Sequence, residues 1–111
     1  MNNQVSFRGV SGKAWSFQET PAHAPWARSP GVVIFASPEA FGWRVLRVME
    51  LTGKPHDLQP IWALAEAERY GATTVFVALE FEGSARKEMV SDLEAGFSPV
   101  CGSANLVPLA A

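Results

Sequence analysis

Several residue types that build chemical sites are scarce in this chain of 111 residues. It has one cysteine, Cys101, and two histidines, His23 and His56, which lie far apart in the sequence. One cysteine cannot form a disulfide within the chain, and two separated histidines cannot supply the roughly four ligands of a zinc site. The sequence therefore predicts no metal site and no cofactor, and it favours a reducing, cytoplasmic environment.

Charged residues are also few, at 18%, and no apolar run approaches the length of a membrane span. The N-terminus lacks the basic and apolar regions of a secretory signal, and the isolated glycines form no phosphate-binding loop. Because 48% of the residues are hydrophobic, few polar side chains remain to cover the surface of the folded domain. We therefore expect some exposed apolar area that binds a protein partner or a second copy, and no association with a membrane.

The charge distribution is uneven, although the net charge is only −2. Residues 1–56 carry six basic and three acidic side chains, whereas residues 57–111 carry three basic and eight acidic ones. One interpretation is a helical half with solvated acidic faces, and the other is a basic sheet surface that meets an anionic partner. The small negative sum does not favour a dedicated nucleic-acid-binding protein.

Hydrophobic periodicity predicts a single α+β domain over residues 1–111. A continuous β-branched run at 32–35 predicts a strand buried on both faces, and the run at 43–51 predicts its antiparallel partner. We expect an antiparallel sheet of three or more strands with two main helices. The order over 31–99 is β-β-α-β-α, with helices at 61–70 and 85–95 and a central strand at 73–81. Residues 1–30 are expected to form an irregular N-terminal segment with short strands at 5–7 and 15–17. Residues 100–111 are expected to form a tail.

Local signals predict the helix ends and the core faces. Asp57 is expected to cap the first helix, Gly71 to end it and Ser84 to cap the second. In the first helix, one stripe is expected to carry Ile61, Leu64, Ala65 and Glu68, and the adjacent stripe Trp62, Ala65 and Arg69. The expected core stripe of the second helix is Met89, Leu93 and Phe97. The turn between the first two strands is expected at 37–42, and alternation in the second strand places Trp43, Val45, Met49 and Leu51 on one face.

Three segments resemble a known family. Pro-Gly-Val-Val-Ile-Phe at 30–35, Val-Leu-Arg-Val-Met at 45–49, and a final helix ending in Phe-Ser-Pro at 97–99 resemble the GIY-YIG nuclease domain. That family opens with a Pro-Gly-Val-Tyr type of strand, continues with a Val-Leu-Tyr-Val-Gly type of strand, and ends with a helix before an aromatic-x-Pro segment. The matched letters are few and mostly hydrophobic.

The resemblance implies a nuclease scaffold that lacks its catalytic residues. The family needs a tyrosine on each of the first two strands, an arginine on the first helix and a metal-binding glutamate on the last. Here Val33 and Arg47 occupy the tyrosine positions, Met49 replaces a glycine, and Val90 stands at the metal position. Valine can neither bind a metal ion nor activate water, so the resemblance favours a protein that is not an enzyme.

The candidate binding residues are two tryptophans and four residues that could contact an anion. Trp26 lies in a proline-rich loop, where it either holds the loop to the domain or contacts a partner. Trp15, Trp43 and Trp62 are expected to be buried or half-buried. Arg44 and Arg47 fall on opposite faces of their strand and form one patch only if the strand bulges. The candidate surface comprises Trp26, Trp43, Arg44, Arg47, Lys54 and His56.

Three functions follow from these residues. The first is a non-catalytic protein-interaction or dimerisation module that uses an apolar surface around Trp26, Trp43 and the sheet edge. The second is a nucleic-acid-binding relative of the GIY-YIG fold without cleavage activity, which would use Arg44, Arg47, Lys54 and His56. The third is a hydrolase or nuclease with displaced catalytic residues, in which a carboxylate such as Glu50 or Glu80 would be needed for metal-dependent cleavage.

Overall fold

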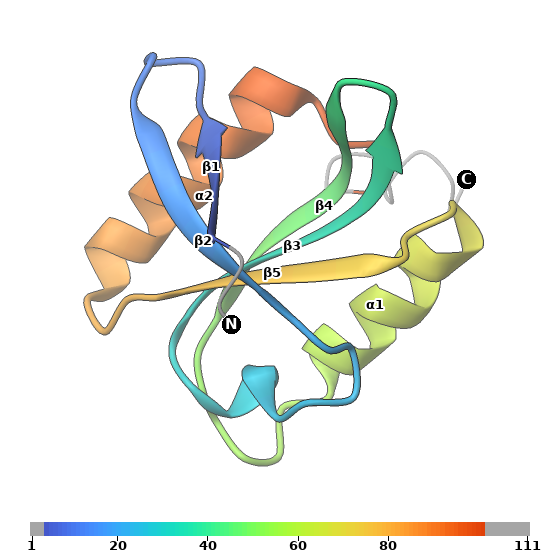
Figure 1. The fold of residues 1–111 in the computed structure, drawn as a ribbon. Helices are drawn as coiled ribbons and strands as arrows, with labels where there is room; N and C mark the ends of the chain where they lie inside the picture. Colours follow the sequence, from blue (N-terminus) through green and yellow to red (C-terminus); the bar gives the residue numbers. More distant parts are fainter. Residues whose placement is uncertain (1–3, 102–111) are drawn as a thin grey trace, which may run out of the picture.

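The structure, a computed structural model that describes residues 4–101, is an antiparallel five-stranded sheet with two helices. The strands run across the curled sheet in the order β1-β2-β5-β3-β4 (Figure 1). The predicted α+β class and the two main helices are confirmed. The strands are β1 (Gln4–Arg8), β2 (Ala14–Thr20), β3 (Gly31–Glu39), β4 (Gly42–Leu51) and β5 (Thr74–Leu79), and the helices are α1 (Gln59–Arg69) and α2 (Gly83–Phe97).

Each face of the sheet has its own hydrophobic core. Side chains that alternate along β3 belong to different cores, so α2 covers one face and α1 covers the other. The core under α2 contains Phe7, Phe17, Val32, Ile34, Ala36, Val45, Val48, Phe76, Met89 and Leu93. The core under α1 contains Trp26, Val33, Phe35, Leu46, Leu51, Ala63, Ala67, Ala72 and Val75.

β3 and β5 form the middle of the sheet. β3 pairs with β4 on one side and β5 on the other, and its residues 31–36 are all buried. β5 is third in the strand order and has β2 as its other neighbour. Two predictions are therefore confirmed: β3 is buried on both faces, and β5 is a central strand.

The N-terminal hairpin is more regular than the sequence indicated. The short strands expected in the first 30 residues are present as β1 and β2, and β2 joins them to the main sheet through β5. Their buried side chains, Phe7 and Phe17, pack edge-to-face at 5.5 Å under α2. Alternation over three residues could reveal each strand but not the distant partner to which β2 pairs.

Asp92 on α2 fastens the turn of this hairpin. Its carboxylate accepts hydrogen bonds from the indole Nε1 of Trp15 at 2.8 Å, and from the Ser11 amide at 2.9 Å and hydroxyl at 2.8 Å. The same carboxylate lies against Gly9, where an added Cβ would stand 2.0 Å from Oδ2. Only glycine allows the hairpin and the helix to approach this closely.

The β3–β4 turn is tighter than predicted. β3 continues through Pro38 to Glu39, which pairs with Gly42, so the connection is the two residues 40–41 and not 37–42. Pairing between β3 and β5 ends at Ala36. Pro38 therefore lies where β3 has one neighbouring strand only, a position at which a sheet tolerates proline.

A β-bulge at Leu46 changes the faces of β4. Phe35 pairs with Arg47 and the next residue of β3 pairs with Val45, so Leu46 is an extra residue. Beyond the bulge the alternation is reversed, because Val48 belongs to the core under α2 and Met49 packs against the core under α1. The predicted shared face of Trp43, Val45, Met49 and Leu51 is therefore wrong after position 46.

α1 contacts the sheet through its smallest residues. Pro60, Ala63 and Ala67 are its buried residues, and Leu64 is partly buried. Of the stripe formed by Ile61, Leu64, Ala65 and Glu68, only Leu64 packs against the core. Alanine at the contact lets the helix axis approach the sheet closely, which leaves the large side chains on the outside.

The ends of α1 follow the predicted signals closely. Asp57 precedes the N-cap residue Leu58 by one position, and its Oδ1 accepts a hydrogen bond of 3.1 Å from the Gln59 amide. Pro60 lies in the first turn, where a missing backbone donor has no helical acceptor. Gly71 has φ of 102° just beyond the helix, as glycine permits.

α2 begins before its predicted cap. The Arg86 amide already donates to the Glu82 carbonyl, so Glu82 is the N-cap and Ser84 lies inside the first turn. The Ser84 hydroxyl bonds to the Glu82 carboxylate at 3.2 Å and does not cap the helix, so that prediction is wrong. The predicted core stripe is confirmed, because Met89 and Leu93 are buried and Phe97 packs against them.

Candidate binding site

A shallow hollow of about 390 Å³ lies between β4 and the first half of α1. It exists because Ala63 provides no bulk where the helix crosses the strand, while larger residues stand around it. Two side chains come from β4 and four from α1, so the site depends on the packing of these two elements. Its lining residues are Arg47, Met49, Gln59, Trp62, Ala63 and Glu66.

Arg47 is the basic group in the wall of this hollow, and its side chain is only 14% exposed. Its terminal nitrogen Nη1 lies 3.6 Å from Oε1 of Glu66, which is longer than a hydrogen bond. Its Nε is buried and has no acceptor among residues 4–101. A buried donor without a partner costs about 1–3 kcal/mol, so the guanidinium group has unused capacity for an anionic acceptor.

Cys101 adds an inert thiol beside this pair. Its amide donates to the carbonyl of the bulged residue Leu46 at 2.8 Å, and its side chain is buried. Burial raises the pKa of the Cys101 thiol, the Glu66 carboxylate raises it further, and Arg47 opposes the rise. The thiol therefore stays protonated at neutral pH and is a poor nucleophile.

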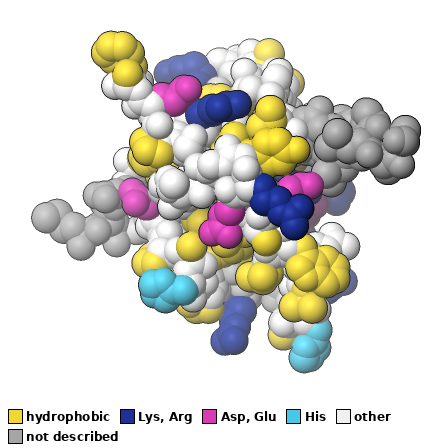
Figure 2. All heavy atoms as spheres, turned by 90° about the vertical axis from the view of Figure 1, so that its right-hand side faces the viewer, with side chains coloured by type: hydrophobic (Ala, Val, Ile, Leu, Met, Phe, Trp, Pro, Cys, Tyr) yellow, Lys and Arg dark blue, Asp and Glu magenta, His cyan; other side chains and the backbone are white. Residues whose placement is uncertain are grey.

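Large apolar side chains continue from the hollow along the outside of α1. Leu58, Ile61 and Trp62 are 53%, 49% and 64% exposed, and their spacing of three and four residues places them on one helical face. We call these three residues the α1 patch. Figure 2 shows this side of the molecule, with hydrophobic groups interspersed with basic and acidic ones. The expectation that Trp62 would be buried or half-buried is wrong, since α1 packs through alanines.

The two candidate tryptophans of the predicted surface lie inside the fold. Trp26 is 6% exposed, packs against Phe35 at 5.5 Å and donates from its Nε1 to the Ala22 carbonyl at 3.0 Å. Of the two predicted roles, it holds the loop to the domain. Trp43 is half-buried on the α2 side of the sheet, 4.9 Å from the ring of Phe76.

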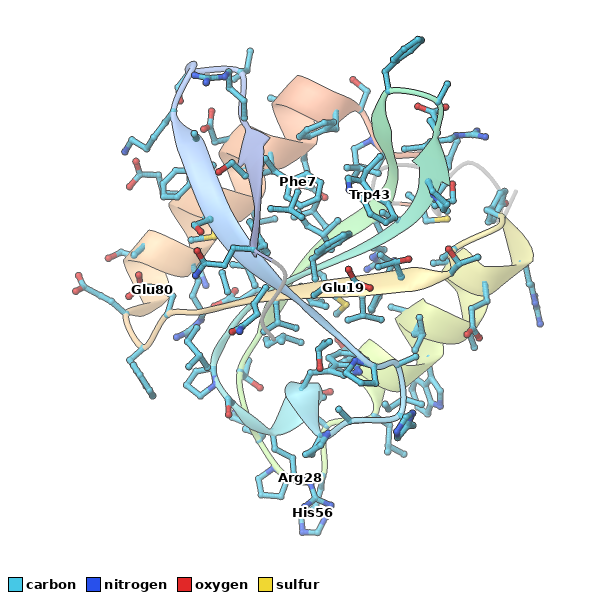
Figure 3. The ribbon with its side chains drawn as sticks, viewed as in Figure 1. Phe7, Glu19, Arg28, Trp43, His56 and Glu80 are labelled. Carbon is cyan, nitrogen blue, oxygen red and sulfur yellow. The ribbon has the colours of Figure 1, made fainter. Side chains whose placement is uncertain are left out.

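The four polar candidates are only partly brought together. The bulge places Arg47 on the α1 side of the sheet, the side to which alternation also assigns Arg44, so the condition for a shared face is met. Lys54 and His56 are exposed in the connection between β4 and α1. In the view of Figure 3, His56 lies at the bottom of the molecule and Trp43 in its upper half.

The positions matched to the nuclease family lie on both sides of the sheet. Val33, Arg47 and Met49 are on the α1 side, whereas Val90 packs against the core under α2. The face at Arg47 is hollowed and the face at Val90 is filled, so the two positions do not share a cleft.

The carboxylates considered for a displaced hydrolase have structural partners. Glu50 accepts from Nε of Arg86 at 2.7 Å and pairs with Lys87 at 3.4 Å. Burial raises the pKa of Glu50, but the bond from Arg86 and the charges of Lys87 and Arg86 outweigh it and lower the pKa overall. Glu80 accepts from the Glu82 amide at 3.2 Å.

The last features of residues 4–101 to consider are groups that could bind a metal ion and helices that could span a membrane. No group of three or more histidine, cysteine, aspartate or glutamate side chains is arranged to hold a metal ion there. In the same range, neither helix has the length and apolar character needed to cross a membrane.

Sequence reasoning found Arg47 but missed its surroundings. Trp62 was expected to be buried or half-buried, and Gln59, Ala63 and Glu66 were not considered. One signal for the exposed face was available in the sequence. Ala63 and Ala67 recur at spacing four, so a contact through these alanines would leave Ile61 and Trp62 outside. Comparison of the chain with protein-family models, curated proteins and solved structures gives no match, so the GIY-YIG resemblance stays a prediction.

Proposed function

We propose that this domain is a non-catalytic interaction module that forms a homodimer through the outer face of α1. The observation that carries the proposal is the α1 patch, in which Leu58, Ile61 and Trp62 are each about half exposed or more on one helical face. A contiguous apolar surface next to a hollow is typical of protein contact sites, whereas single exposed apolar residues are common everywhere.

Exposed hydrophobic residues on the hairpins and at the end of β5 support this choice by contrast. Phe41 and Val10 are exposed at two separate hairpin tips. Leu79 and Phe81 are exposed at the end of β5, but Glu80 and Glu82 lie between and after them in the chain. None of these places combines three apolar side chains on one rigid element.

A second copy of the chain is the partner that the charges favour. The outward side of α1 carries Glu66 and Glu68 as well as Arg69, and Arg47 lies beside it. A two-fold interface brings the same surface into contact with itself, which requires both signs of charge around an apolar centre. An acidic or a basic partner would instead favour one sign.

The alternative, a nucleic-acid-binding relative of the nuclease fold, has weaker support. Arg47 is largely buried in a small hollow beside the Glu66 carboxylate, so it is not part of an exposed basic surface along which a nucleic-acid backbone could lie. Lys54 and His56 are exposed but lie in another segment, and the chain as a whole carries a charge of −2. A phosphate-binding surface needs several accessible cations that act together.

The oligomeric state tests the proposal directly. We expect the intact chain to sediment as a dimer in analytical ultracentrifugation at a concentration of about 100 μM, as for an interface of moderate affinity. The double variant L58S/I61S should be a folded monomer under the same conditions, because two of the three apolar anchors become polar.

The matched control is L79S/F81S, which changes two exposed apolar residues outside the α1 patch. It should sediment as the parent does. A monomeric parent chain would overturn the proposal, and so would a dimer that L79S/F81S dissociates and L58S/I61S leaves intact.

A further inference from the structure

The hollow beside Arg47 supports an inference that goes beyond dimerisation. We infer that it binds a carboxylate attached to an apolar body, supplied by a small organic acid or by an acidic side chain in a peptide. Three features of the hollow favour this ligand: a cationic donor without an acceptor, the loose contact of that cation with Glu66, and the apolar walls.

The donor is Nε of Arg47, which is buried without an acceptor among the described residues. Folding removes this N–H group from water, and no acceptor of the described residues replaces the lost hydrogen bond. A carboxylate is the acceptor whose two oxygens match the fork of a guanidinium group, and the bond is strengthened by opposite charge. Arg47 lines the hollow, so a turn of its guanidinium group toward the hollow brings this buried donor to a ligand.

Glu66 leaves room for such a ligand. Its Oε1 is 3.6 Å from Nη1 of Arg47, so the two groups attract each other without a hydrogen bond. A ligand carboxylate can therefore bind Nε while Glu66 stays near Nη1. The Glu66 charge weakens the binding of a second anion, and its removal should strengthen that binding.

The apolar body has its own contacts. Trp62 stands at the wall of the hollow with Met49 and Ala63, while the polar Gln59 completes the lining. The volume of about 390 Å³ is near the lower end for small-molecule sites. It fits an aromatic ring or a branched aliphatic chain with one carboxylate, because these groups can stack on the indole and reach the arginine.

Nuclear magnetic resonance titration of the full chain with phenylacetate tests the inference. Phenylacetamide is the matched neutral probe, with nearly the same shape and no charge. We expect phenylacetate to bind with Kd of about 1 mM and to shift the Nε–H signal of Arg47 and the indole signal of Trp62. Phenylacetamide should bind about tenfold more weakly, because it lacks the charge-assisted bond.

Three variants assign the effect to the hollow. Arg47→Lys keeps the charge but removes the planar fork, so phenylacetate binding should weaken about tenfold. Arg44→Lys makes the same change on an exposed side chain of the same strand and should leave binding unchanged. Glu66→Gln should tighten phenylacetate binding. The Arg47 signal of the parent chain gives a readout that does not depend on any variant folding.

A pair of blocked tripeptides, Leu-Glu-Leu and Leu-Gln-Leu, separates the two sources of the carboxylate. Tighter binding of the glutamate peptide than of phenylacetate identifies an acidic side chain, and the reverse identifies a small acid. Equal shifts by phenylacetate and phenylacetamide, or phenylacetate binding unaffected by Arg47→Lys, would overturn the inference. L58S/I61S should still bind phenylacetate, since neither residue lines the hollow, so failure of dimerisation and failure of this site are distinguishable.

Discussion

At the scale of single residues, Asp92 connects the N-terminal hairpin to α2 and makes the fold sensitive to acid. The hydrogen bond from Trp15 is the main cause that lowers the pKa of Asp92 below its ordinary value of 3.8, with further bonds from Ser11. A lowered pKa in the folded chain means that the ionised form stabilises the fold. This stabilisation is complete above pH 3.8 and is lost as the pH falls through the lower folded-state pKa.

We therefore predict that Asp92→Asn reduces stability at neutral pH and removes part of the acid dependence of unfolding. Urea unfolding at several pH values between neutrality and the acid range measures both effects. Glu88→Gln is the control, because its contact with Lys13 joins two exposed side chains and should contribute little. Parallel pH profiles for the parent and Asp92→Asn would contradict the role given to the carboxylate.

Two of the tryptophans, Trp26 and Trp62, should differ sharply in their effect on stability. Trp26→Ala removes a side chain that is 6% exposed and bonded to Ala22, and we predict a loss of about 3–5 kcal/mol. Trp62→Ala removes an exposed side chain and should change the unfolding free energy of the monomer by less than about 0.5 kcal/mol. Thermal and urea unfolding of both variants at low protein concentration would show whether this order is reversed.

At the scale of elements, the contact of α1 with the sheet should not accept a larger side chain. Ala67 is fully buried in that contact, whereas Ala65 is exposed on the same helix. We predict that Ala67→Leu destabilises the fold by about 1–3 kcal/mol through overpacking, while Ala65→Leu is nearly neutral. Urea unfolding compares the two, and equal effects would mean that helix propensity, not packing, decides the outcome.

This alanine contact also explains what the sequence could and could not reveal about α1. Its existence, its start near Asp57 and its end at Gly71 follow from local signals and were predictable, although the N-cap residue is Leu58 and not Asp57. Its buried face was not, because hydrophobic periodicity assigns the largest apolar residues to the core. Ile61 and Trp62 are exposed because the close approach of helix and sheet leaves space only for Ala63 and Ala67.

The bulge in β4 limits prediction of the candidate site in the same way. Arg47 was recognisable as a candidate from its type and position, but a single extra residue at Leu46 decides which side of the sheet it faces. Nothing in the letters around Leu46 marks the bulge, since it is set by pairing with β3. The partners of Arg47 on α1 therefore required the tertiary structure.

At the scale of the whole molecule, the sheet should open from its N-terminal edge. β1 has one neighbouring strand, and β2 pairs with β5 only over residues 18–20. β3 is paired on both sides and lies between two cores. We predict that amides of β3 exchange with deuterium most slowly and those of β1 fastest among the strands. Protection of β1 equal to that of β3 in a native-state exchange experiment would contradict this order.

The fold as a whole was easier to predict than its edges. The hairpin of β3 and β4, the central place of β5 and the core stripe of α2 all follow from strong local patterns. β2 pairs with β5 across more than fifty residues of sequence. No local sequence pattern between the two strands predicts this pairing. Such pairings are decided by which surfaces remain to be buried once the local elements have formed.

The contact of α1 through alanine has a consequence for how this protein can change over evolutionary time. The residues that fix the helix, Ala63 and Ala67, are different from those that it displays, Leu58, Ile61 and Trp62. A lineage can therefore replace the displayed residues and acquire a new binding preference with little penalty in folding. Selection would be expected to preserve the small residues and to diversify the large ones, the opposite of the usual pattern for a helix on a sheet.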